Sequence, residues 1–221
     1  MGKTDIKSLP LEQLEQWAVE YGEKKFRAKQ LYQWMHVKLV DDPEQMSNLS
    51  AAFRQKIREN CTFTVLKQVT MQESALDGTR KYLFELEDHN MVESVLMRYK
   101  HGNSVCISSQ VGCRMGCRFC ASTIGGLTRN LLPSEMLDQV YRIQELTGER
   151  VSNVVVMGTG EPLDNYDNLI RFIRILSDEK GQNISQRNLT VSTCGLVPRI
   201  RQLAEEDLTI TLALSLHAPN D

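Results

Sequence analysis

Three cysteines stand close together in this chain, at Cys113, Cys117 and Cys120, with three and then two residues between them. Cysteine thiolates are the usual ligands of iron–sulfur clusters, and a complete electron-transfer cluster takes four of them. No fourth cysteine follows at a matching offset. A cubane cluster held by these three residues would therefore keep one iron open for a substrate or cosubstrate. The spacing predicts a catalytic [4Fe–4S] cluster.

A structural zinc site is the alternative, because zinc also takes cysteine and needs four ligands in such sites. His89, His101 or His217 could supply the fourth ligand. Met115 and Phe119 make the loop apolar, which suits an oxygen-sensitive cluster. We therefore favour the cluster over zinc, and both over a disulfide.

Length and composition indicate a globular protein. The 221 residues are 41% hydrophobic and 24% charged, which allows a packed core. No apolar run approaches the length of a membrane span, and the start of the chain lacks the apolar segment of a secretion signal. Gly2 is not followed by Ser or Thr at position 6, which argues against myristoylation. We expect a cytoplasmic, reducing setting, where clustered cysteines indicate metal binding or catalysis.

Charge gives no global support for nucleic-acid binding, since the net charge is −2. Local basic clusters do occur, and their members are Lys24, Lys25, Arg27 and Lys29; Arg54, Lys56 and Arg58; and Arg114, Arg118 and Arg129. Such clusters are most often solvated helix faces. They would attract phosphates only if several shared one surface.

The first 60 residues read as three helices that make a small accessory domain. Apolar residues recur at helical spacing from Leu11 to Tyr21, and Gly22 ends that run. We expect Trp17 and Trp34 to form the core of this unit. Residues 61–103 then become β-prone, with a hairpin signal at Asp77-Gly78, and read as a β-ribbon linker.

From residue 104 the pattern alternates between strands and helices. The expected strands are 104–108, 151–157, 188–193 and 209–216, and the expected helices are 134–146, 166–176 and 197–203. Ser134 is the expected N-cap of the first of these helices, and Gly148 its end. This rhythm predicts an α/β fold with a parallel sheet and right-handed crossovers.

Candidate site residues fall at the ends of the expected strands. Ligands bind at the carboxyl ends of strands in parallel α/β sheets. The cysteine loop follows the first strand, and Gly160 and Glu161 follow the second. Glu161 reads as a partner for a cation such as an amino-acid ammonium, although a solvated turn is the alternative. Ser192 and Ser215 could bind a ribose or carboxylate, or simply pack.

The cysteine loop, the glycine–glutamate loop and the alternating strands together resemble the radical S-adenosylmethionine (radical SAM) superfamily. Longer stretches are similar to the RlmN-type RNA methyltransferases. These stretches are residues 92–98, 105–113, 125–131, 157–168 and 215–220. The resemblance implies a partial, incomplete radical SAM (β/α) barrel over 104–221, preceded by an RNA-binding-like helical domain over 1–60 and the β-hairpin linker over 61–103.

The resemblance also implies site residues and cofactors. Cys113, Cys117 and Cys120 would hold the [4Fe–4S] cluster, whose open iron takes S-adenosylmethionine (SAM). The residues that would hold SAM are Gly160, Glu161, Ser192, Ser215, Leu216 and His217. The family methylates C-2 of an adenosine in 23S rRNA and of the adenosine beside the anticodon in some tRNAs. It implies an electron donor such as flavodoxin, no membrane, and a monomer.

Catalysis in this family runs through a methylated cysteine of the enzyme. A second cysteine, matched by Cys106, resolves the protein–RNA adduct and forms a disulfide, and Glu93 matches the family's proton acceptor. The methyl-carrying cysteine lies in the family's C-terminal part, beyond Asp221. We therefore expect this polypeptide alone not to complete the reaction. Cys194 stands where the family commonly has a small residue, and we assign it no role; Cys61 reads as incidental.

Other functions remain open on the sequence. A Cfr-type enzyme would methylate C-8 of the same ribosomal adenosine. A non-catalytic RNA-binding protein would use the helical domain and the basic clusters, and would bind RNA without the three cysteines. A zinc module would be distinguished by metal analysis.

Overall fold

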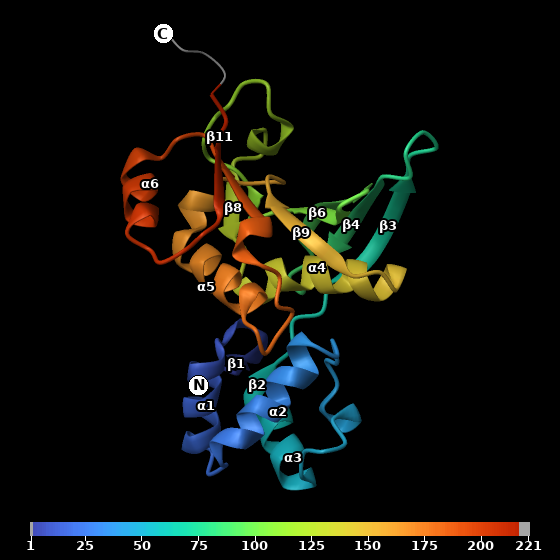
Figure 1. Cartoon of the computed structure of the whole chain (residues 1–221), viewed down its shortest axis with the longest axis vertical. Helices are drawn as coiled ribbons and strands as arrows, with labels where there is room; N and C mark the ends of the chain where they lie inside the picture. Colours follow the sequence, from blue (N-terminus) through green and yellow to red (C-terminus); the bar gives the residue numbers. More distant parts are fainter. Residues whose placement is uncertain (1, 217–221) are drawn as a thin grey trace.

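The computed structural model describes residues 2–216 and places a small helical unit at the N-terminal end (Figure 1). Its helices are α1 (Leu11–Glu20), α2 (Lys25–His36) and α3 (Ala51–Asn60), and the short strands β1 (Thr4–Asp5) and β2 (Cys61–Thr62) pair in parallel. Buried residues recur three and four positions apart along α1, as the periodicity predicted. Gly22 follows α1 with a φ of +76°.

The two tryptophans of this unit differ in burial. Trp17 is buried against Tyr21 and Phe53, so its place in the core is confirmed. Trp34 is only half-buried, and its indole N–H donates to Asn48 Oδ1 at 2.5 Å. The expectation that both form the core was wrong for Trp34, because its polar edge is satisfied near the surface.

One sheet of seven strands dominates the rest of the described chain, in the order β11-β10-β9-β6-β5-β4-β3. The strands are β3 (Lys67–Glu73), β4 (Arg80–Glu85), β5 (Met91–Tyr99), β6 (Gly102–Ile107), β9 (Val151–Val156), β10 (Leu189–Thr193) and β11 (Thr211–Leu214). Strands β6, β9, β10 and β11 are parallel, as predicted, and β3 to β5 are antiparallel. The antiparallel β5–β6 pair makes the ribbon and the parallel strands one continuous sheet.

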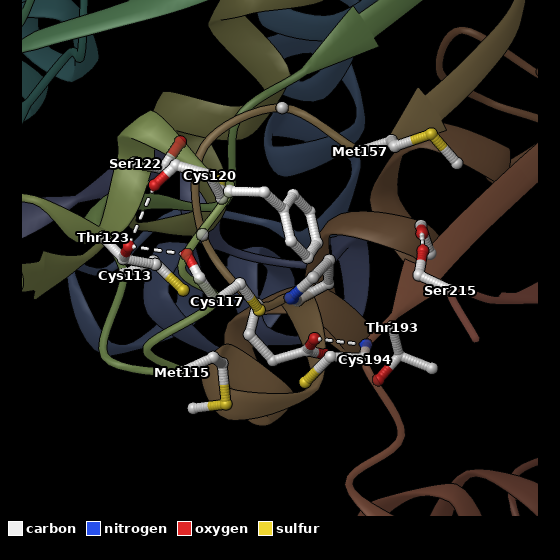
Figure 2. A pocket seen from close by; sticks show the side chains of 16 residues that line it. Cys113, Met115, Cys117, Cys120, Ser122, Thr123, Met157, Thr193, Cys194 and Ser215 are labelled. Carbon is white, nitrogen blue, oxygen red and sulfur yellow. Dashed lines mark hydrogen bonds between the residues drawn. The ribbon is translucent and has the colours of Figure 1, made fainter. Parts of the chain in front are cut away.

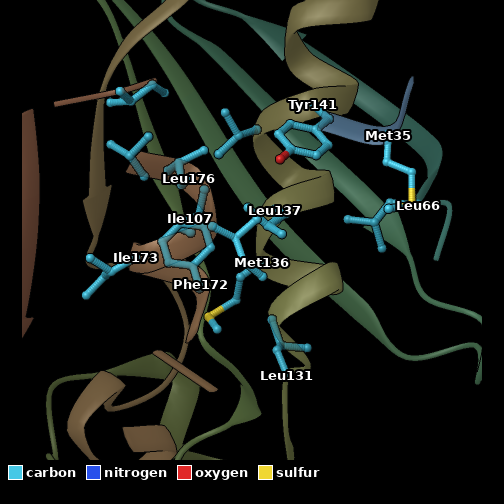
Figure 3. Close-up of a cluster of buried hydrophobic side chains, with 14 of the residues drawn as sticks. Met35, Leu66, Ile107, Leu131, Met136, Leu137, Tyr141, Phe172, Ile173 and Leu176 are labelled. Atoms are coloured by element: carbon cyan, nitrogen blue, oxygen red, sulfur yellow. The ribbon is translucent and has the colours of Figure 1, made fainter. Parts of the chain in front are cut away.

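Helices α4 (Pro133–Thr147) and α5 (Tyr166–Ser177) cover one face of this sheet, and α6 (Val197–Ala204) precedes β11 (Figure 1). Figure 3 shows side chains of both covering helices meeting Ile107 of β6 in a buried apolar cluster. Because side chains alternate along a strand, Val105 faces this core while Cys106 faces the opposite side. Glu93 shares that opposite side, since it stands two residues before Val95, the partner of Cys106.

The start of α4 differs from the prediction. Leu132, not Ser134, is the N-cap, and its N–H donates to Glu135 Oε2 at 2.8 Å. Pro133 occupies the first helical position, where its missing N–H costs nothing, so the helix begins before Ser134. Ser134 instead donates to Asp5 Oδ2 at 2.6 Å, which ties α4 to the N-terminal unit. The C-terminal end at Gly148 is confirmed by its φ of +68°.

Two β-prone regions differ from the expectation. The segment 61–103 is interrupted near its start, because β2 ends at Thr62 and β3 begins only at Lys67. Between them, the buried Leu66 donates its N–H to Asp138 Oδ2 at 2.6 Å instead of to a neighbouring strand. The last strand, expected over 209–216, spans Thr211–Leu214. Among the described helices, none has the length and apolarity that a membrane crossing requires.

Candidate functional site

The cysteine loop is the tip of a small hairpin formed by β7 (Gln110–Gly112) and β8 (Leu127–Asn130). Gly112 has a φ of +75°, and a Cβ there would lie 2.0 Å from the carbonyl oxygen of Gly126. Only glycine fits where these two segments of the backbone come so close together. Cys113 then donates its N–H to the same carbonyl at 3.0 Å, and Thr123 Oγ1 donates to the Cys117 and Cys120 carbonyls. The loop is therefore closed on its own backbone.

Glu161 lies at the carboxyl end of β9, where a glycine turn brings it against the hairpin. Gly160 has a φ of +104°, and a Cβ there would lie 2.5 Å from Gln110 Cβ. Gln110, fully buried, accepts the Glu161 N–H at 2.9 Å and donates to Asp164 Oδ2 at the same distance. This amide fixes the turn to the base of the cysteine loop.

The Glu161 carboxylate is buried and oriented, with 4% of the residue exposed. Its Oε1 accepts the N–H of Leu163 at 3.0 Å, and its Oε2 accepts the N–H of Cys194 at 2.9 Å. Within the described part of the chain, no cationic side chain forms an ion pair with this carboxylate. A buried carboxylate without a cation is costly. It therefore suits a ligand that brings a positive charge.

Two serines at the ends of neighbouring strands complete the opposite wall. Ser192 of β10 and Ser215, directly after β11, lie with their hydroxyl oxygens 3.0 Å apart. The parallel register of the two strands brings these residues together across 23 positions of sequence. One of the hydroxyls can turn to a ligand without losing the other as a partner.

These groups line one cavity of about 240 Å³, far larger than a single ion requires (Figure 2). The predicted residues that line it are Cys113, Cys117, Cys120, Gly160, Glu161, Ser192 and Ser215. Leu216 is 67% exposed and is not part of this wall. The expected contact at His217 lies outside the described residues.

The two residues expected to act in catalysis lie outside this wall, on the uncovered face of the sheet. Cys106 is half-buried, and burial raises the pKa of its thiol, opposed by a hydrogen bond with the backbone of Met157. Met157 itself lines the cavity, so Cys106 is its neighbour. Glu93 is exposed, and its Oε1 lies 3.0 Å from Lys81 Nζ. All six cysteines lie within the described residues, and all are free thiols.

The histidines offered as zinc ligands lie elsewhere. His89 Nδ1 contacts Glu85 at 2.8 Å, and His101 stacks on Tyr99 with ring centroids 5.1 Å apart. Neither lines the cavity, and His217 lies outside the described residues. The described residues contain no three histidine, cysteine or acidic side chains grouped around a single metal ion.

The donor set fits an iron–sulfur cluster. Burial raises the pKa of the Cys113 thiol, and Glu161, Cys117 and Cys120 raise it further, against a lowering hydrogen bond from Met115. The three side chains line one cavity, and a cationic cluster bound between them would favour their thiolate forms. A cubane spreads its thiolates over several irons, so they need not converge on one point. The loop, the cavity and the thiol chemistry agree with the group.

Sequence reasoning missed two site residues. Gln110 lies in the stretch 105–113, but its residue type did not indicate that its side chain would pack against Gly160. Cys194 lines the cavity with the three loop cysteines, although it stands 74 residues after Cys120. The signal for Cys194 was its position directly after an expected strand, at the carboxyl edge of the sheet.

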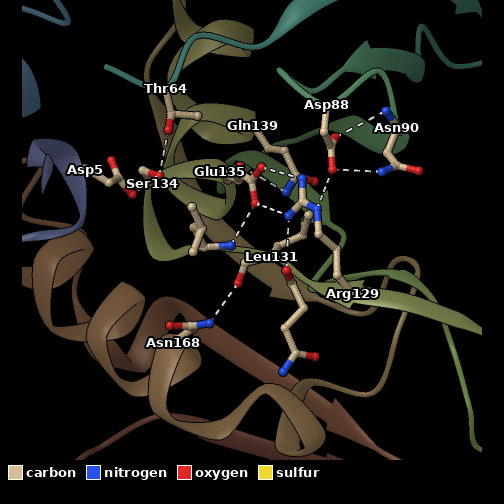
Figure 4. A network of polar contacts seen from close by, with 12 residues as sticks. Asp5, Thr64, Asp88, Asn90, Arg129, Leu131, Ser134, Glu135, Gln139 and Asn168 are labelled. Atoms are coloured by element: carbon tan, nitrogen blue, oxygen red, sulfur yellow. Dashed lines mark hydrogen bonds and ion pairs between the residues drawn. The ribbon is translucent and has the colours of Figure 1, made fainter. Parts of the chain in front are cut away.

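The basic clusters are largely engaged in structural contacts. Arg114 pairs with Asp164 at 2.5 Å, and Lys56 donates to Glu23 at 2.9 Å. Arg129 bridges Asp88 and Glu135 at 2.6 and 2.8 Å and so joins the hairpin β7–β8 to α4 (Figure 4). These arginines and lysines therefore serve the fold, whatever else they bind.

Comparison with known families gives two matches. Residues 107–221 match the family model described as the radical SAM superfamily. Residues 4–63 match the one described as the ribosomal RNA large subunit methyltransferase N-terminal domain. The two matches fall on the parallel half of the sheet and on the helical unit.

Comparison with individual proteins extends over nearly the whole chain. A "probable dual-specificity RNA methyltransferase RlmN" of Lachnospira eligens is 67% identical over 99% of this chain, and one of Lachnoclostridium phytofermentans is 65% identical. The chain spans 62% of the length of these relatives. The crystal structure of a radical SAM methyltransferase from Sphaerobacter thermophilus superposes with a TM-score of 0.91 at 41% identity, covering 99% of this chain and 65% of that one.

Proposed function

This chain belongs to the radical SAM superfamily, and we propose that it forms part of a SAM-dependent RNA methyltransferase. The observation that carries the proposal is the cavity in which the three-cysteine loop meets Glu161, Ser192 and Ser215. The superfamily match and the relatives' names point to the same activity.

Each wall of the cavity has a separate task. Cys113, Cys117 and Cys120 would hold the cluster, which would supply the electron for the reductive cleavage of SAM. Glu161 takes the ammonium of the SAM methionine, since its buried carboxylate has two backbone donors and no ion pair with any described side chain. Ser192 and Ser215 take hydroxyl or carboxylate groups of SAM. Gln110 keeps Gly160 and Glu161 in register with the cysteine loop.

We further propose that the substrate is an adenosine of RNA, methylated at C-2 in 23S rRNA and in tRNA through a methyl-cysteine intermediate. Two relatives whose names give dual-specificity RNA methyltransferase support an RNA substrate. Cys106 and Glu93 share the uncovered face of the sheet, and Cys106 neighbours Met157 of the cavity lining. There Cys106 would resolve the protein–RNA adduct, and Glu93 would accept a proton. An electron donor such as flavodoxin and a monomeric state belong to the same proposal.

Nucleoside analysis of RNA from living cells tests this proposal. We expect digested 23S rRNA and tRNA to lose 2-methyladenosine when the gene is deleted, and to regain it when the gene is restored. A gene carrying Cys117→Ala should not restore it. Cys61→Ala is the matched control, because Cys61 is a buried thiol outside the cavity. Appearance of 8-methyladenosine, or unchanged RNA after deletion, would refute C-2 methylation.

A further inference from the structure

Four cysteines, not three, line the cavity. Figure 2 shows Cys194 near Thr193 and Ser215, across the hollow from the cysteine loop. Cys194 comes from the end of β10, so it reaches the site independently of the loop. Its side chain lines the same cavity as those of Cys113 and Cys117.

The backbone of Cys194 is held in place beside the cavity, while its side chain is exposed. Its N–H donates to Glu161 Oε2 at 2.9 Å, and the next residue, Gly195, turns the chain with a φ of +107°. Gly195 also donates its N–H to Thr193 Oγ1 at 3.1 Å. A cysteine has a single side-chain torsion before its sulfur, with three staggered positions. With the backbone fixed, the position of the thiol therefore depends on rotation about the Cα–Cβ bond of Cys194.

Cys194 also lies beside the place assigned to the amino group of SAM. Its backbone N–H binds Glu161, the carboxylate that takes the SAM ammonium in the proposed function, and its side chain lines the same cavity. In the proposed function, this SAM molecule also binds the open iron. A sulfur next to the ammonium site is thus next to the one iron that the loop cysteines leave without a protein ligand.

We propose that Cys194 supplies the fourth thiolate to the cluster while SAM is absent, and gives up this position when SAM binds. The inference rests on the proposed function. Formation of the Cys194 sulfur–iron bond releases the thiol proton to solvent. When SAM arrives, its amino and carboxylate groups replace the sulfur on iron, and the thiolate takes a proton again. No electron is transferred in either direction.

The exchange protects the site at no cost to its chemistry. An iron without a protein ligand is lost first under oxidation, because only solvent holds it. A fourth thiolate on a separate strand closes this weak point between turnovers. Glu161 then favours release, since it repels the thiolate and attracts the SAM ammonium.

Loss of the fourth iron measures the proposal directly, without an activity assay. The 221-residue chain is reconstituted anaerobically with iron and sulfide, as wild type, Cys194→Ala, Cys194→Ser and the control Cys61→Ala. Each sample is then treated briefly with ferricyanide, and the three-iron cluster is counted by electron paramagnetic resonance. We expect a several-fold larger three-iron signal in both Cys194 variants than in wild type and Cys61→Ala.

Thiol labelling gives a second measurement that does not depend on a variant. In reconstituted wild type, iodoacetamide should label Cys194 slowly, and added SAM should speed the labelling, as read by peptide mass spectrometry. Equal three-iron signals in all four proteins, or labelling of Cys194 that SAM leaves unchanged, would overturn the inference. Failure of every protein to take up iron would instead refute the proposed function itself.

Discussion

Single residues decide the shape of the cavity where backbones cross. Gly160 is the clearest case, because it combines a φ of +104° with a contact to Gln110 that leaves no room for a Cβ. The sequence showed a glycine before a glutamate, which indicates a turn. It could not show that Gln110, 50 positions earlier, fills the space beside it, since that contact depends on the packing of hairpin β7–β8 against β9.

The variant Gly160→Ala tests this packing. An alanine Cβ would meet Gln110 Cβ at 2.5 Å, in a backbone conformation that side chains rarely adopt. We expect about 1–3 kcal/mol loss in the free energy of unfolding, measured by urea denaturation. Gly125→Ala is the matched control, since a Cβ there meets nothing within 4 Å. Equal stability of the two variants would contradict the account.

Elements are joined by buried polar groups that the sequence did not reveal. Periodicity predicted the three N-terminal helices and the strand–helix alternation, since each depends on neighbours in the sequence. It did not predict that Lys7 would be buried and bonded to Asp138 of α4 at 2.5 Å, across 131 positions. It likewise missed that Ser134 would bind Asp5 and leave the capping of α4 to Glu135. Contacts between distant segments leave no periodic signal.

Removal of Lys7 should loosen the N-terminal unit from α4. Lys7 Nζ also donates to Asp41 Oδ1 and to the Thr64 carbonyl, both at 2.8 Å. The variant Lys7→Met removes the nearer cation from the buried Asp138 carboxylate and leaves Arg142, whose Nε lies 3.4 Å from Asp138 Oδ2. We expect at most about 3–5 kcal/mol of destabilisation. Lys29→Met should change stability little, because Lys29 is 54% exposed and lies 3.9 Å from Glu15. A thermal melt that gives similar values for both variants would argue against a buried ion pair.

The same interface should make stability depend on pH through His36 of α2. Burial, and then Lys7, lowers its pKa to about 3, and its Nδ1 lies 2.9 Å from the Tyr141 hydroxyl. Between pH 6.5 and about 3, the unfolded chain binds a proton that the folded chain does not. Folding stability therefore falls as pH falls through this window, by at most about 1.4 kcal/mol per unit from this group.

Denaturation at several pH values checks this slope. His36→Gln should flatten it, whereas His89→Gln should leave it unchanged, since the His89 side chain is 86% exposed. A wild-type stability that rises on acidification from pH 6.5, or a slope that His36→Gln does not alter, would be inconsistent with a neutral, buried His36.

At the scale of the whole molecule, the sheet gathers the site from segments far apart in sequence. The cysteine loop, the Glu161 turn, Cys194 and Ser215 all lie at the carboxyl ends of β6, β9, β10 and β11 or on the hairpin after β6. This placement follows from parallel topology alone, so the sequence could predict it. The burial of Glu161, with no ion pair among residues 2–216, could not be predicted, because it depends on three segments that pack together.

The central claim is that this cavity holds a cluster with one iron open to SAM, and one spectroscopic titration tests it. The 221-residue chain is reconstituted anaerobically, its iron and sulfide are counted, and the reduced cluster is followed by electron paramagnetic resonance as SAM is added. The account predicts about four irons and four sulfides per chain and a spectrum that shifts with SAM. The cluster and the spectral shift should be lost in Cys117→Ala but not in Cys61→Ala. Stoichiometric zinc, or a cluster whose spectrum SAM does not change, would contradict it.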